Sequence, residues 1–585
     1  MTALSRRETT LSMLEEARRS GRVMLATVSG VASTKPALVD FFDKKVPAID
    51  VITTKSFQVT PNPGNREPII TEPVSGSFGN SVGLRNPGMI QAVEDMRSLR
   101  VNGLSNTLLN ISVSASTPED FITLVKAFEP YADIIELNFS CPHASVGFGA
   151  SIGCDSGIAA EYMKAVRDAV GADCEALIFP KLTPNVEDIG VIAMSVKAAG
   201  ADGISAINTT GPEVYREPHS GEVILNNKIG GKGGQSGAWI QEKALECISR
   251  IREVVGPEFP ILGMGGVSTG SDAAAMIQAG ADIVGIGSAF GKVHQKNWPA
   301  YIQSVKQSAE EILSGSGNDT GNDSGDDAKS YLTTDRSMEY IPFSISKNIN
   351  HTEDISILYL DGTMKCGPGE YAFIWIPGVG EKPFSIAEQN PLTFIVKKRG
   401  YFTRKLLSLS EGDTLYVRGV YGAEVNLPDK PRAVLAAGGT GIAVLPSLAA
   451  KLEQKKINMD IYYGTSSESE SEPLLKERLG RYGTFTAVSD DGVPGRVLDI
   501  LETREKDLSE TACFFVGPEP FMAKAAKIAV DHGAEKSAVM LSMERTSLCG
   551  IGMCGECACG DRLTCRYGTF VSYEFLENNA PEILK

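Results

Sequence analysis

The chain has 585 residues, 60 of them glycine, and a formal net charge of −16. Such an acidic balance argues against nonspecific binding to nucleic acid or to an anionic membrane, and the length predicts three or four domains. No apolar run is long enough to span a bilayer, and residues 1–20 predict a polar amphipathic helix rather than a signal peptide. We therefore expect a cytoplasmic protein.

The first half, up to about residue 313, alternates short apolar runs with helical patterns. Eight runs predict buried strands, at 23–28, 51–54, 107–113, 133–137, 176–182, 203–208, 260–265 and 283–287. Eight such strands with intervening helices over about 300 residues are typical of an α/β chain that folds as a (β/α)8 barrel. A doubly wound open sheet is the alternative.

In a barrel of this kind, functional residues lie at the carboxyl ends of the strands. The candidates there are Ser29, Gly30, Lys55, Ser56, Asn110, Asn138, Cys141, Lys181, Asn208, Thr209, Thr210, Gly265, Gly266, Gly287 and Ser288. Glycines after the last two strands can expose N–H groups to a phosphate, which favours a phosphorylated cofactor such as FMN. Lys181 can stabilise negative charge on a reduced flavin ring. A lone cysteine is more often structural, but these neighbours favour a catalytic role for Cys141.

Five of the eleven cysteines lie close together near the end of the chain. Four follow the pattern Cys549-x4-Cys554-x2-Cys557-x7-Cys565, which is typical of a plant-type [2Fe–2S] cluster. Zinc is the alternative, and Cys559 is a fifth thiol that could replace Cys557 or Cys565. The remaining cysteines are scattered and predict single buried residues, at 141, 154, 174, 247, 366 and 513.

Composition divides the rest of the chain. Residues 314–335 predict a flexible acidic linker, because 314–327 contains no apolar residue. Short strands with alternating apolar positions predict a small antiparallel barrel over 336–428. Strands alternating with helices predict a nucleotide-binding fold over 429–540, and 541–585 carries the cysteine cluster.

The nucleotide fold begins with a strand, a glycine turn and a helix, the context that a dinucleotide pyrophosphate needs. The residues expected to contact NAD are Gly438, Gly439, Thr440 and Gly441, with Gly517 and Pro518 from a second strand end. The later segment 465–472 carries no Arg or Lys to bind a 2′-phosphate. This favours NAD over NADP.

The strand ends of the first half carry a set of short motifs: Lys55, NSVGLRNPG (80–88), ELNFSCP (136–142), KLTPNV (181–186), IN (207–208), GGQSG (233–237) and GMGG (263–266). Together they resemble the catalytic subunit of class 1B dihydroorotate dehydrogenase. The motifs occur in order, each at a strand end, and the resemblance extends over about residues 23–305. It implies that residues 1–313 form an FMN-binding barrel domain.

The resemblance also implies residue roles. Cys141 would remove the C5 proton of dihydroorotate while hydride passes from C6 to FMN. Substrate would contact Lys55, Asn80, Asn138, Asn208, Thr209 and the backbone of Val82, Gly83 and Leu84, and FMN would contact Ser29, Gly30, Lys55, Ser56, Asn110, Asn138, Lys181, Gly237, Gly265, Gly266, Gly287 and Ser288. A thiol with an ordinary pKa of about 8.5 needs only modest lowering to act as a base. Cys154, in the loop 147–157, is the competing base, and His143 stands where the family commonly has Asn.

The second half carries its own resemblances. Lys382, Pro383, Phe384 and Ser385 resemble the Arg-Pro-x-Ser motif that binds FAD in the ferredoxin-reductase superfamily. Lys382 keeps the charge of that motif but lacks the bidentate fork of arginine, and Phe402 stands where a flavin-site glycine is usual. CGIGMCGEC (549–557) with TCRYGTFV (564–571) resembles the electron-transfer subunit of the same class 1B enzyme, over roughly residues 340–575.

Together the resemblances predict a fusion protein that oxidises dihydroorotate to orotate in pyrimidine synthesis. Electrons would pass through FMN, a [2Fe–2S] cluster and FAD to NAD+. Because family members join two catalytic and two electron-transfer subunits, we expect a homodimer. One alternative is an NAD-linked dihydropyrimidine dehydrogenase acting on uracil or thymine, although NSVGL (80–84) favours dihydroorotate. The other is a general electron carrier between NADH and an acceptor.

Overall fold

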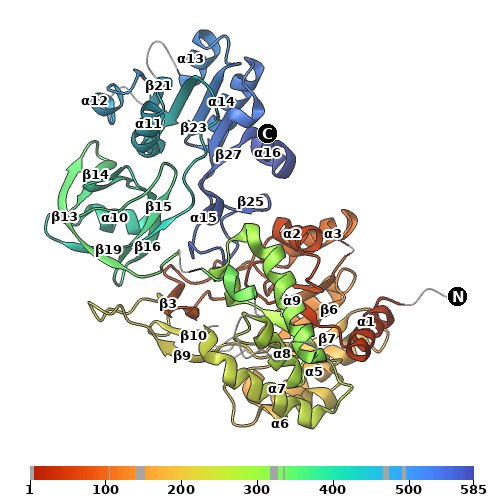
Figure 1. Cartoon of the computed structure of the whole chain (residues 1–585). Coiled ribbons are helices and arrows are strands. Elements are labelled where there is room, and N and C mark those ends of the chain that lie inside the picture. The colour runs from red at the N-terminus through yellow and green to blue at the C-terminus, as the bar shows by residue number, and fades with distance from the viewer. Residues whose placement is uncertain are drawn as a thin grey trace. The chain divides into compact units, whose positions relative to one another are not determined.

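The computed structural model describes residues 5–104, 106–139, 152–315, 327–333, 336–465, 473–489 and 496–585. The chain folds into two compact units (Figure 1). The first contains Met1–Asp335 and the short segment Gly552–Gly555. The second contains Arg336–Ile551 and Glu556–Lys585.

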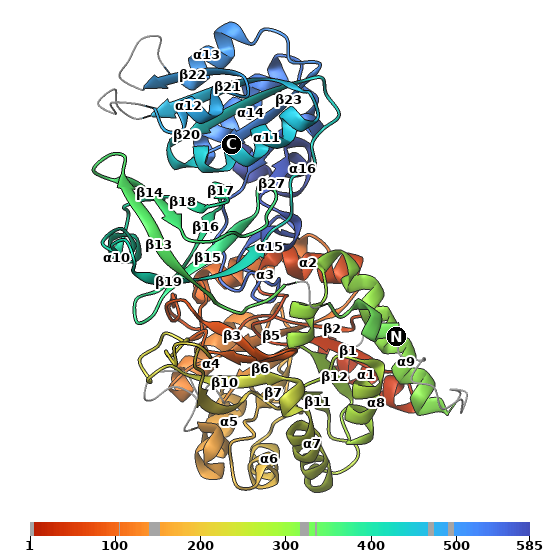
Figure 2. The same cartoon turned by 60° about the vertical axis from the view of Figure 1, so that its left-hand side comes forward.

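Eight parallel strands close into a barrel in the first unit (Figure 2). In barrel order they are β1 (Met24–Thr27), β12 (Ile283–Ile286), β11 (Ile261–Met264), β8 (Ile204–Ala206), β7 (Leu177–Lys181), β6 (Ile134–Asn138), β5 (Leu108–Val113) and β2 (Val51–Thr53). Each overlaps one predicted run, and all their residues are buried, as expected for parallel strands covered by helices. The (β/α)8 prediction is confirmed, and the open-sheet alternative is wrong.

Helices surround the barrel strands, and α1 (Arg6–Ser20) packs at their amino-terminal end. The others are α2 (Pro36–Lys45), α3 (Met89–Val101), α4 (Pro118–Phe128), α5 (Ser156–Val170), α6 (Ile189–Ala198), α7 (Gln241–Val255), α8 (Gly270–Gln278) and α9 (Trp298–Ser314). Side chains of Ser5, Thr117, Asp155 and Thr269 accept backbone N–H groups of the first turns, which fixes where these helices begin. The predicted N-terminal helix is therefore present as α1.

Four aspartates close the amino-terminal end of the barrel. Each precedes a strand and accepts a backbone N–H of the neighbouring strand, in the pairs Asp50 with Leu25, Asp133 with Leu109, Asp202 with Ile178 and Asp282 with Ile261. Each also meets at least one cation, from the set Arg7, Arg18, Arg22, Arg100, Arg167, Arg252 and Lys306. Asp133 is buried and the other three are half-buried, and this repeated pairing gives each carboxylate both a cation and a backbone donor.

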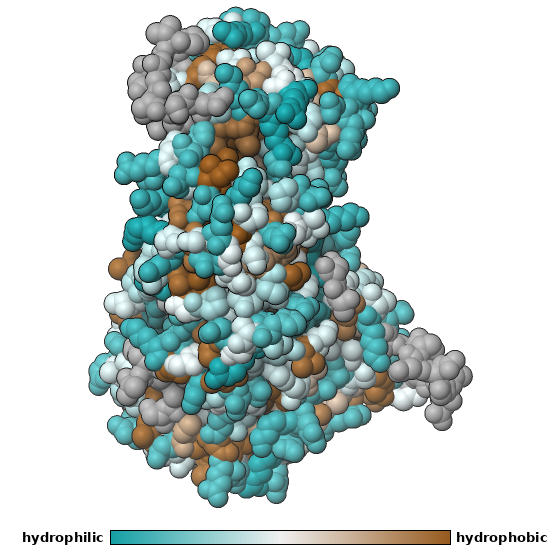
Figure 3. Space-filling view, turned by 90° about the vertical axis from the view of Figure 1, so that its left-hand side faces the viewer, coloured by the Kyte–Doolittle hydropathy of each residue, from teal (hydrophilic) through white to brown (hydrophobic). Residues whose placement is uncertain are grey.

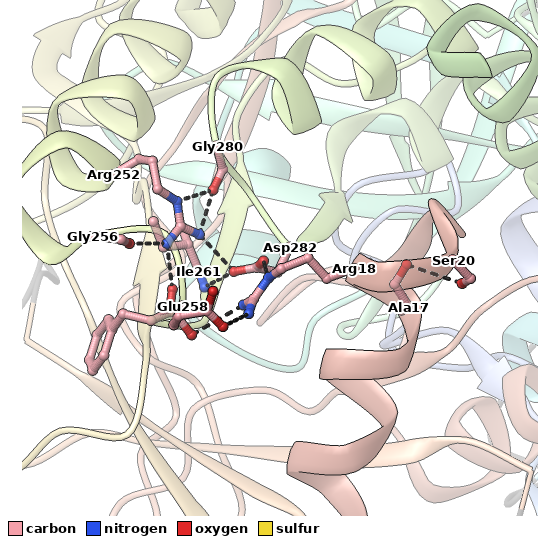
Figure 4. Close-up of polar contacts among 10 residues, drawn as sticks. Ala17, Arg18, Ser20, Arg252, Gly256, Glu258, Ile261, Gly280 and Asp282 are labelled. Atoms are coloured by element: carbon pink, nitrogen blue, oxygen red, sulfur yellow. Dashed lines mark hydrogen bonds and ion pairs between the residues drawn. The ribbon is translucent and has the colours of Figure 1, made fainter.

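Figure 4 shows one of these groups. Arg18 of α1 and Arg252 of α7 both donate to the Asp282 carboxylate, at 2.9 and 2.8 Å. Arg252 also donates to the carbonyls of Gly256 and Gly280 at 2.5 and 2.7 Å. The ion pairs thus attach α1 to the barrel end.

A small antiparallel sheet is added to the barrel. Its order is β3 (Ile70–Val74), β4 (Ser77–Asn80), β10 (Lys232–Gly237) and β9 (Thr210–Val214). The sequence did not predict these strands, which are short and contain glycine or proline. Their importance is that β4 ends at Asn80 and β10 ends at Gly237, two of the predicted site residues.

Part of the predicted linker is folded. Residues 327–331 form the 3-10 helix η5 (Asp327–Tyr331), in which Ala328 is fully buried. The Tyr331 ring lies 6.4 Å from the Tyr301 ring of α9, and Thr333 donates its N–H to the Lys292 carbonyl at 2.8 Å. The apolar side chains after residue 327 explain why this segment packs.

The second unit begins with a seven-stranded antiparallel sheet. Its order is β16 (Gly380–Ser385), β15 (Tyr371–Ile376), β19 (Thr414–Tyr421), β13 (Ile341–Asn350), β14 (Ile355–Leu360), β18 (Leu392–Lys397) and β17 (Glu388–Gln389). β16 also contacts β18, so the sheet curls as the predicted small barrel would. The helix α10 (Tyr401–Leu407) packs on β16 and β18.

A six-stranded sheet follows, as predicted for a nucleotide fold. Its order is β22 (Thr484–Ser489), β21 (Asn458–Thr465), β20 (Arg432–Gly438), β23 (Thr511–Val516), β24 (Val539–Ser542) and β27 (Phe570–Ser572), parallel except for β27. Its helices are α11 (Leu445–Gln454), α12 (Lys476–Leu479), α13 (Val497–Arg504), α14 (Glu519–Asp531) and α16 (Tyr573–Asn579). The cysteine segment contains β25 (Ala558–Cys559), β26 (Arg562–Leu563) and α15 (Thr564–Tyr567).

On the face drawn in Figure 3, hydrophobic residues form small groups among hydrophilic ones. In the parts of the chain that are described, we find no helix with the length and apolar character needed to span a lipid bilayer.

Candidate active site and cysteine centre

The carboxyl ends of the barrel strands bring together polar side chains that are distant in sequence. Lys55 and Ser56 follow β2, Asn110 lies on β5, Asn138 ends β6 and Lys181 ends β7. All five are buried. The strand register pairs Asn138 with Lys181, which places the two side-chain positions at the same level. These predicted residues therefore share one end of the barrel.

A chain of hydroxyl groups runs through this end. The hydroxyl oxygens of Ser29 and Ser56 are 3.2 Å apart, and those of Ser56 and Ser112 are 2.9 Å apart. Asn138 donates its side-chain N–H to the Ser56 hydroxyl at 3.0 Å. The Ser112 hydroxyl donates to Oε1 of Glu136 at 2.9 Å, so the chain ends on a carboxylate.

Glu136 is the carboxylate at the base of this site. It is fully buried, and its Oε1 lies 3.5 Å from Nζ of Lys181. Its Oε2 has no hydrogen-bond partner among the described residues. Neither Glu136 nor Ser112 is among the residues predicted from the sequence. The available signal was a carboxylate within an apolar strand, since a buried charge requires a partner.

Three further buried polar atoms lie on or just after the barrel strands β5 and β8. Oδ1 of Asn110, Oγ1 of Thr209 and Oγ of Ser205 have no hydrogen-bond partner in the part of the chain that the structure describes. Buried polar atoms in native proteins are normally hydrogen-bonded to protein, water or ligand. A flavin ring and a pyrimidine carry both N–H and C=O groups. The orphaned atoms therefore fit ligands of that chemistry.

Glycines open the backbone where a phosphate would bind. Gly265 and Gly266 follow β11 with φ of +133° and +79°, and a Cβ on either would lie 2.7 or 2.6 Å from a neighbouring side chain. Gly237 has a φ of +97°, and a Cβ at this position would lie only 2.2 Å from the carbonyl oxygen of Gly76. Gly287 and Ser288 follow β12 and are half-buried. The strand ends thus have the close-packed glycine backbone that a phosphate cradle needs.

Further predicted substrate residues lie at or just after the ends of β4 and β8. Asn80 is half-buried and donates to the Gly234 carbonyl at 3.3 Å. Gly83 and Leu84 both have positive φ, +75° and +56°. Positive φ is uncommon for a leucine, and strained backbone is frequent at ligand sites. Asn208 accepts the Thr209 N–H at 2.8 Å, and Val82 is half-buried beside Gly83.

Cys141 and Cys154 are the two candidates for the catalytic base. Cys141 and His143 lie outside the described residues. Cys154, predicted as buried, is exposed, and its thiol donates to the Asn185 carbonyl at 3.9 Å. Desolvation of its sulfur nevertheless raises the pKa of the thiol. A raised pKa is the opposite of what a base near neutral pH needs.

The predicted FAD motif lies on β16. Lys382 is exposed, whereas Pro383, Phe384 and Ser385 are half-buried. The rings of Phe384 and Phe402 stack with their centroids 6.2 Å apart. The aromatic residue that replaces the usual glycine therefore packs on the motif itself. An exposed cation beside half-buried small and aromatic residues fits a phosphate and a ring.

The predicted NAD residues come together at the carboxyl ends of β20 and β23. Gly438 ends β20, Gly439, Thr440 and Gly441 form the turn before α11, and β23 is the neighbouring parallel strand. A Cβ on Gly441 would lie 2.8 Å from the Val516 carbonyl oxygen. Gly517 and Pro518 directly follow Val516, the last residue of β23. This switch between strands is where open α/β sheets bind nucleotides.

Three of the four predicted iron ligands gather in the second unit. The sulfur atoms of Cys557 and Cys565 are 3.3 Å apart, and the Cys549 thiol lies within hydrogen-bonding reach of Cys565. All three are buried. The neighbouring thiols of Cys549 and then Cys557, together with burial, raise the pKa of the Cys565 thiol. Bound iron is what would keep such a group of thiols as thiolates.

The fourth predicted ligand, Cys554, is half-buried and belongs to the segment Gly552–Gly555, which is grouped with the first unit. Across the described residues, no three His, Cys, Asp or Glu side chains are arranged to hold a single metal ion. That result does not conflict with the thiol pair, because a two-iron cluster takes its four thiolates over two iron atoms. Cys559 is buried in the hydrophobic core beside β27.

Comparison with known proteins identifies relatives for both halves. Residues 23–313 match the family model described as Dihydroorotate dehydrogenase. The dihydroorotate dehydrogenase B (NAD(+)) catalytic subunit of Methanothermobacter thermautotrophicus is 40% identical over 266 residues, 46% of this chain and 82% of that protein. The probable electron transfer subunit of the same enzyme from Thermococcus kodakarensis is 35% identical over 220 residues, 37% of this chain and 89% of that protein. A chain of the solved NADH-dependent reduced ferredoxin-NADP oxidoreductase structure is 23% identical, with a TM-score of 0.36. The match covers 40% of this chain and 88% of that chain.

Proposed function

This chain belongs to the dihydroorotate dehydrogenase B family, and from that premise we propose that it oxidises dihydroorotate to orotate with NAD+ as acceptor. The observation that carries the proposal is that one polypeptide matches most of a catalytic subunit and most of an electron-transfer subunit. Substrate oxidation and the electron outlet then belong to the same molecule. The reaction serves pyrimidine nucleotide synthesis.

The proposal assigns each part of the chain a cofactor. Residues 1–313 form the FMN domain, and 314–335 connect it to the rest. Residues 336–428 bind FAD, 429–540 bind NAD and 541–585 hold a [2Fe–2S] cluster. When bound, FMN would supply a hydride acceptor for dihydroorotate oxidation, and the cluster and FAD would supply an electron route to NAD+. Asn110, Lys181 and the glycines after β11 and β12 would hold FMN, and Cys549, Cys554, Cys557 and Cys565 would hold iron.

The chain supplies the proton chemistry and the charge. Cys141 accepts the C5 proton of dihydroorotate as a thiolate base. Lys181 presents a buried ammonium group, which favours the negative charge that develops during hydride removal. Glu136, 3.5 Å from Lys181, holds that ammonium in place. Asn80, Asn208 and Thr209 orient the pyrimidine ring through their amide and hydroxyl groups.

The test is an assay of substrate choice. The purified chain is supplied with NAD+ and either dihydroorotate or dihydrouracil, and NADH is followed. We expect turnover of dihydroorotate only. Turnover of dihydrouracil alone would establish the dihydropyrimidine dehydrogenase alternative instead.

A second assay separates catalysis from electron transfer. Cys141→Ser should abolish dihydroorotate oxidation and leave reduction of a dye by NADH unchanged, because the NAD and FAD residues are intact. Dihydroorotate oxidation that survives this substitution would show that another group is the base.

Cofactor content tests the rest of the proposal. Flavin extraction and iron analysis should give FMN, FAD and one two-iron cluster for each chain. The chain should sediment as a homodimer and fractionate with the cytoplasm. Absence of FAD or iron from the purified protein would remove the electron outlet.

A further inference from the structure

A buried arginine in the second unit lies between two of the proposed cofactor sites. Arg418 of β19 is 1% exposed, and so is its partner Glu381 of β16. Nε of Arg418 donates to Oε2 of Glu381 at 2.6 Å, and Nη2 donates to Oε1 at 2.7 Å. Glu381 directly precedes Lys382, the first residue of the proposed FAD motif. Since adjacent side chains of a strand face opposite sides, Glu381 is buried where Lys382 is exposed.

The other donors of Arg418 reach the cysteine segment. Nη1 donates to the Cys549 carbonyl at 2.9 Å and to the Tyr421 hydroxyl at 2.8 Å. Nη2 donates to the Leu548 carbonyl at 3.1 Å. All five N–H groups of the guanidinium are therefore used, and two of them hold the backbone at the first proposed iron ligand.

Aromatic rings enclose this arrangement. The guanidinium lies 4.1 Å from the centroid of the Phe373 ring, and the Tyr340 hydroxyl donates to Oε2 of Glu381 at 2.5 Å. A Cβ on Gly550 would lie 2.8 Å from the Tyr421 ring, so the backbone after Cys549 packs directly on that tyrosine. The segment has little freedom to move.

The energetics argue for more than stabilisation. The guanidinium of Arg418 and the carboxylate of Glu381 are both buried and pair directly with each other. A buried ion pair often contributes no net stability relative to a hydrophobic pair of similar volume. What a hydrophobic pair cannot supply is the set of directed hydrogen bonds to the Leu548 and Cys549 carbonyls.

We propose that Arg418 is a positioning residue that holds Cys549 in register for the iron–sulfur cluster and ties that position to the FAD-binding strand β16. The proposal rests on the cluster and the FAD of the proposed function. Groups around a metal ligand orient it and tune the metal, and cluster potentials respond to local charge.

The test measures the reduction potential of the cluster in two neutralised variants. Glu381→Gln leaves the arginine charge uncompensated, which favours the reduced cluster and shifts the potential upward. Arg418→Gln leaves the carboxylate uncompensated and shifts the potential downward. Both variants should lose thermal stability. A purely structural role would lower the stability of both variants without shifting their cluster potentials in opposite directions. Opposite shifts of the potential would therefore show that the charges of Arg418 and Glu381 act on the cluster.

A hydrophobic double variant keeps the test informative if Arg418→Gln does not fold. Arg418→Met combined with Glu381→Leu removes both charges together and should fold. We expect loss of iron from the purified full chain or an altered EPR spectrum of the reduced cluster, with FMN content unchanged. A double variant with full iron and the wild-type spectrum and potential would overturn the proposal.

The matched control is Arg432, which pairs with Asp460 and Glu505 at 2.6 and 2.7 Å in the nucleotide sheet. Arg432→Gln should lower thermal stability and leave the cluster potential and EPR spectrum unchanged. The same shifts in this control would show that the Arg418 effect is general destabilisation. Wild-type protein without an iron–sulfur cluster would overturn the proposed function together with this proposal. Wild-type protein with a cluster that the Arg418 and Glu381 substitutions do not affect would overturn this proposal alone.

Discussion

The two ends of the barrel in the first unit differ in how their polar side chains are paired. At the amino-terminal end, the carboxylates of Asp50, Asp133, Asp202 and Asp282 each bond a backbone N–H and an arginine or lysine. At the carboxyl end, Asn110, Thr209 and Glu136 keep buried oxygen atoms without partners in the described residues. One end is complete by itself. The other presents buried acceptors that, within the described residues, are left for a ligand.

This difference separates stability from function. A satisfied charged network resists change because removing one member leaves another buried and unpaired. Unsatisfied polar atoms cost stability until a ligand meets them. We therefore expect substitutions at the amino-terminal end to affect unfolding and substitutions at the carboxyl end to affect ligand binding and turnover.

Among the substitutions that compare the two barrel ends, the largest effect is expected for Lys181→Met combined with Glu136→Gln, which neutralises both members of the pair. Turnover of dihydroorotate should fall on the order of 1000-fold, because the cation that we propose to lie near the reacting ring is lost. The unfolding temperature should stay near the wild-type value, since no buried charge is left unpaired. A large loss of stability with normal turnover would reverse our assignment of the two barrel ends.

Asp282→Ala addresses the opposite end. It leaves Arg18 and Arg252 without their shared carboxylate and removes the acceptor of the Ile261 N–H. The free energy of unfolding, from urea denaturation, should fall by about 3 kcal/mol, with KM for dihydroorotate unchanged. Asp168→Asn breaks the exposed Lys164–Asp168 pair and should change stability by less than about 0.5 kcal/mol. Equal effects of the two substitutions would contradict the account.

Asn110→Ala probes one orphaned oxygen. Removing the acceptor that we assign to the flavin should raise the dissociation constant of FMN about tenfold, which corresponds to one hydrogen bond. Equilibrium dialysis of the flavin measures this change. Unaltered FMN affinity would show that Oδ1 of Asn110 meets a different group.

The smallest effect concerns the ion pair at the start of α6. Hydrogen bonds from Arg250, and then from the Gly190 N–H, lower the pKa of Asp188 to about 2. A folded pKa below the unfolded value of about 4 gives stability that is present above pH 4 and is lost as the pH falls toward 2. Asp188→Asn should therefore cost more stability at pH 6 than at pH 3 in urea denaturation. An equal difference at both pH values would mean that the carboxylate gains nothing from this pair.

The sequence predicted the barrel because its strands are buried on both faces and read as apolar runs. It also placed Lys55, Asn138 and Lys181 together, because parallel strands bring their carboxyl ends to one side. The strands β3, β4, β9 and β10 were not predictable in this way. They are short and rich in glycine or proline, and only their pairing with each other makes them strands.

Side-chain partnerships were also beyond the sequence. Glu136 and Arg418 lie in predicted strands and Glu381 lies outside them, and for none of the three does a local pattern indicate the partner. The same holds for the aspartates before the strands, whose paired cations lie up to 264 residues away. Pairing over such separations is set by topology.

The central claim is that one polypeptide couples dihydroorotate oxidation to NAD+ reduction. The most direct measurement follows orotate and NADH together in an anaerobic mixture of the purified chain, dihydroorotate and NAD+. We predict that the two products form at the same rate and in equal amounts, and that Cys141→Ser stops both. Formation of NADH without orotate, or of neither product by a chain that carries its cofactors, would contradict the account.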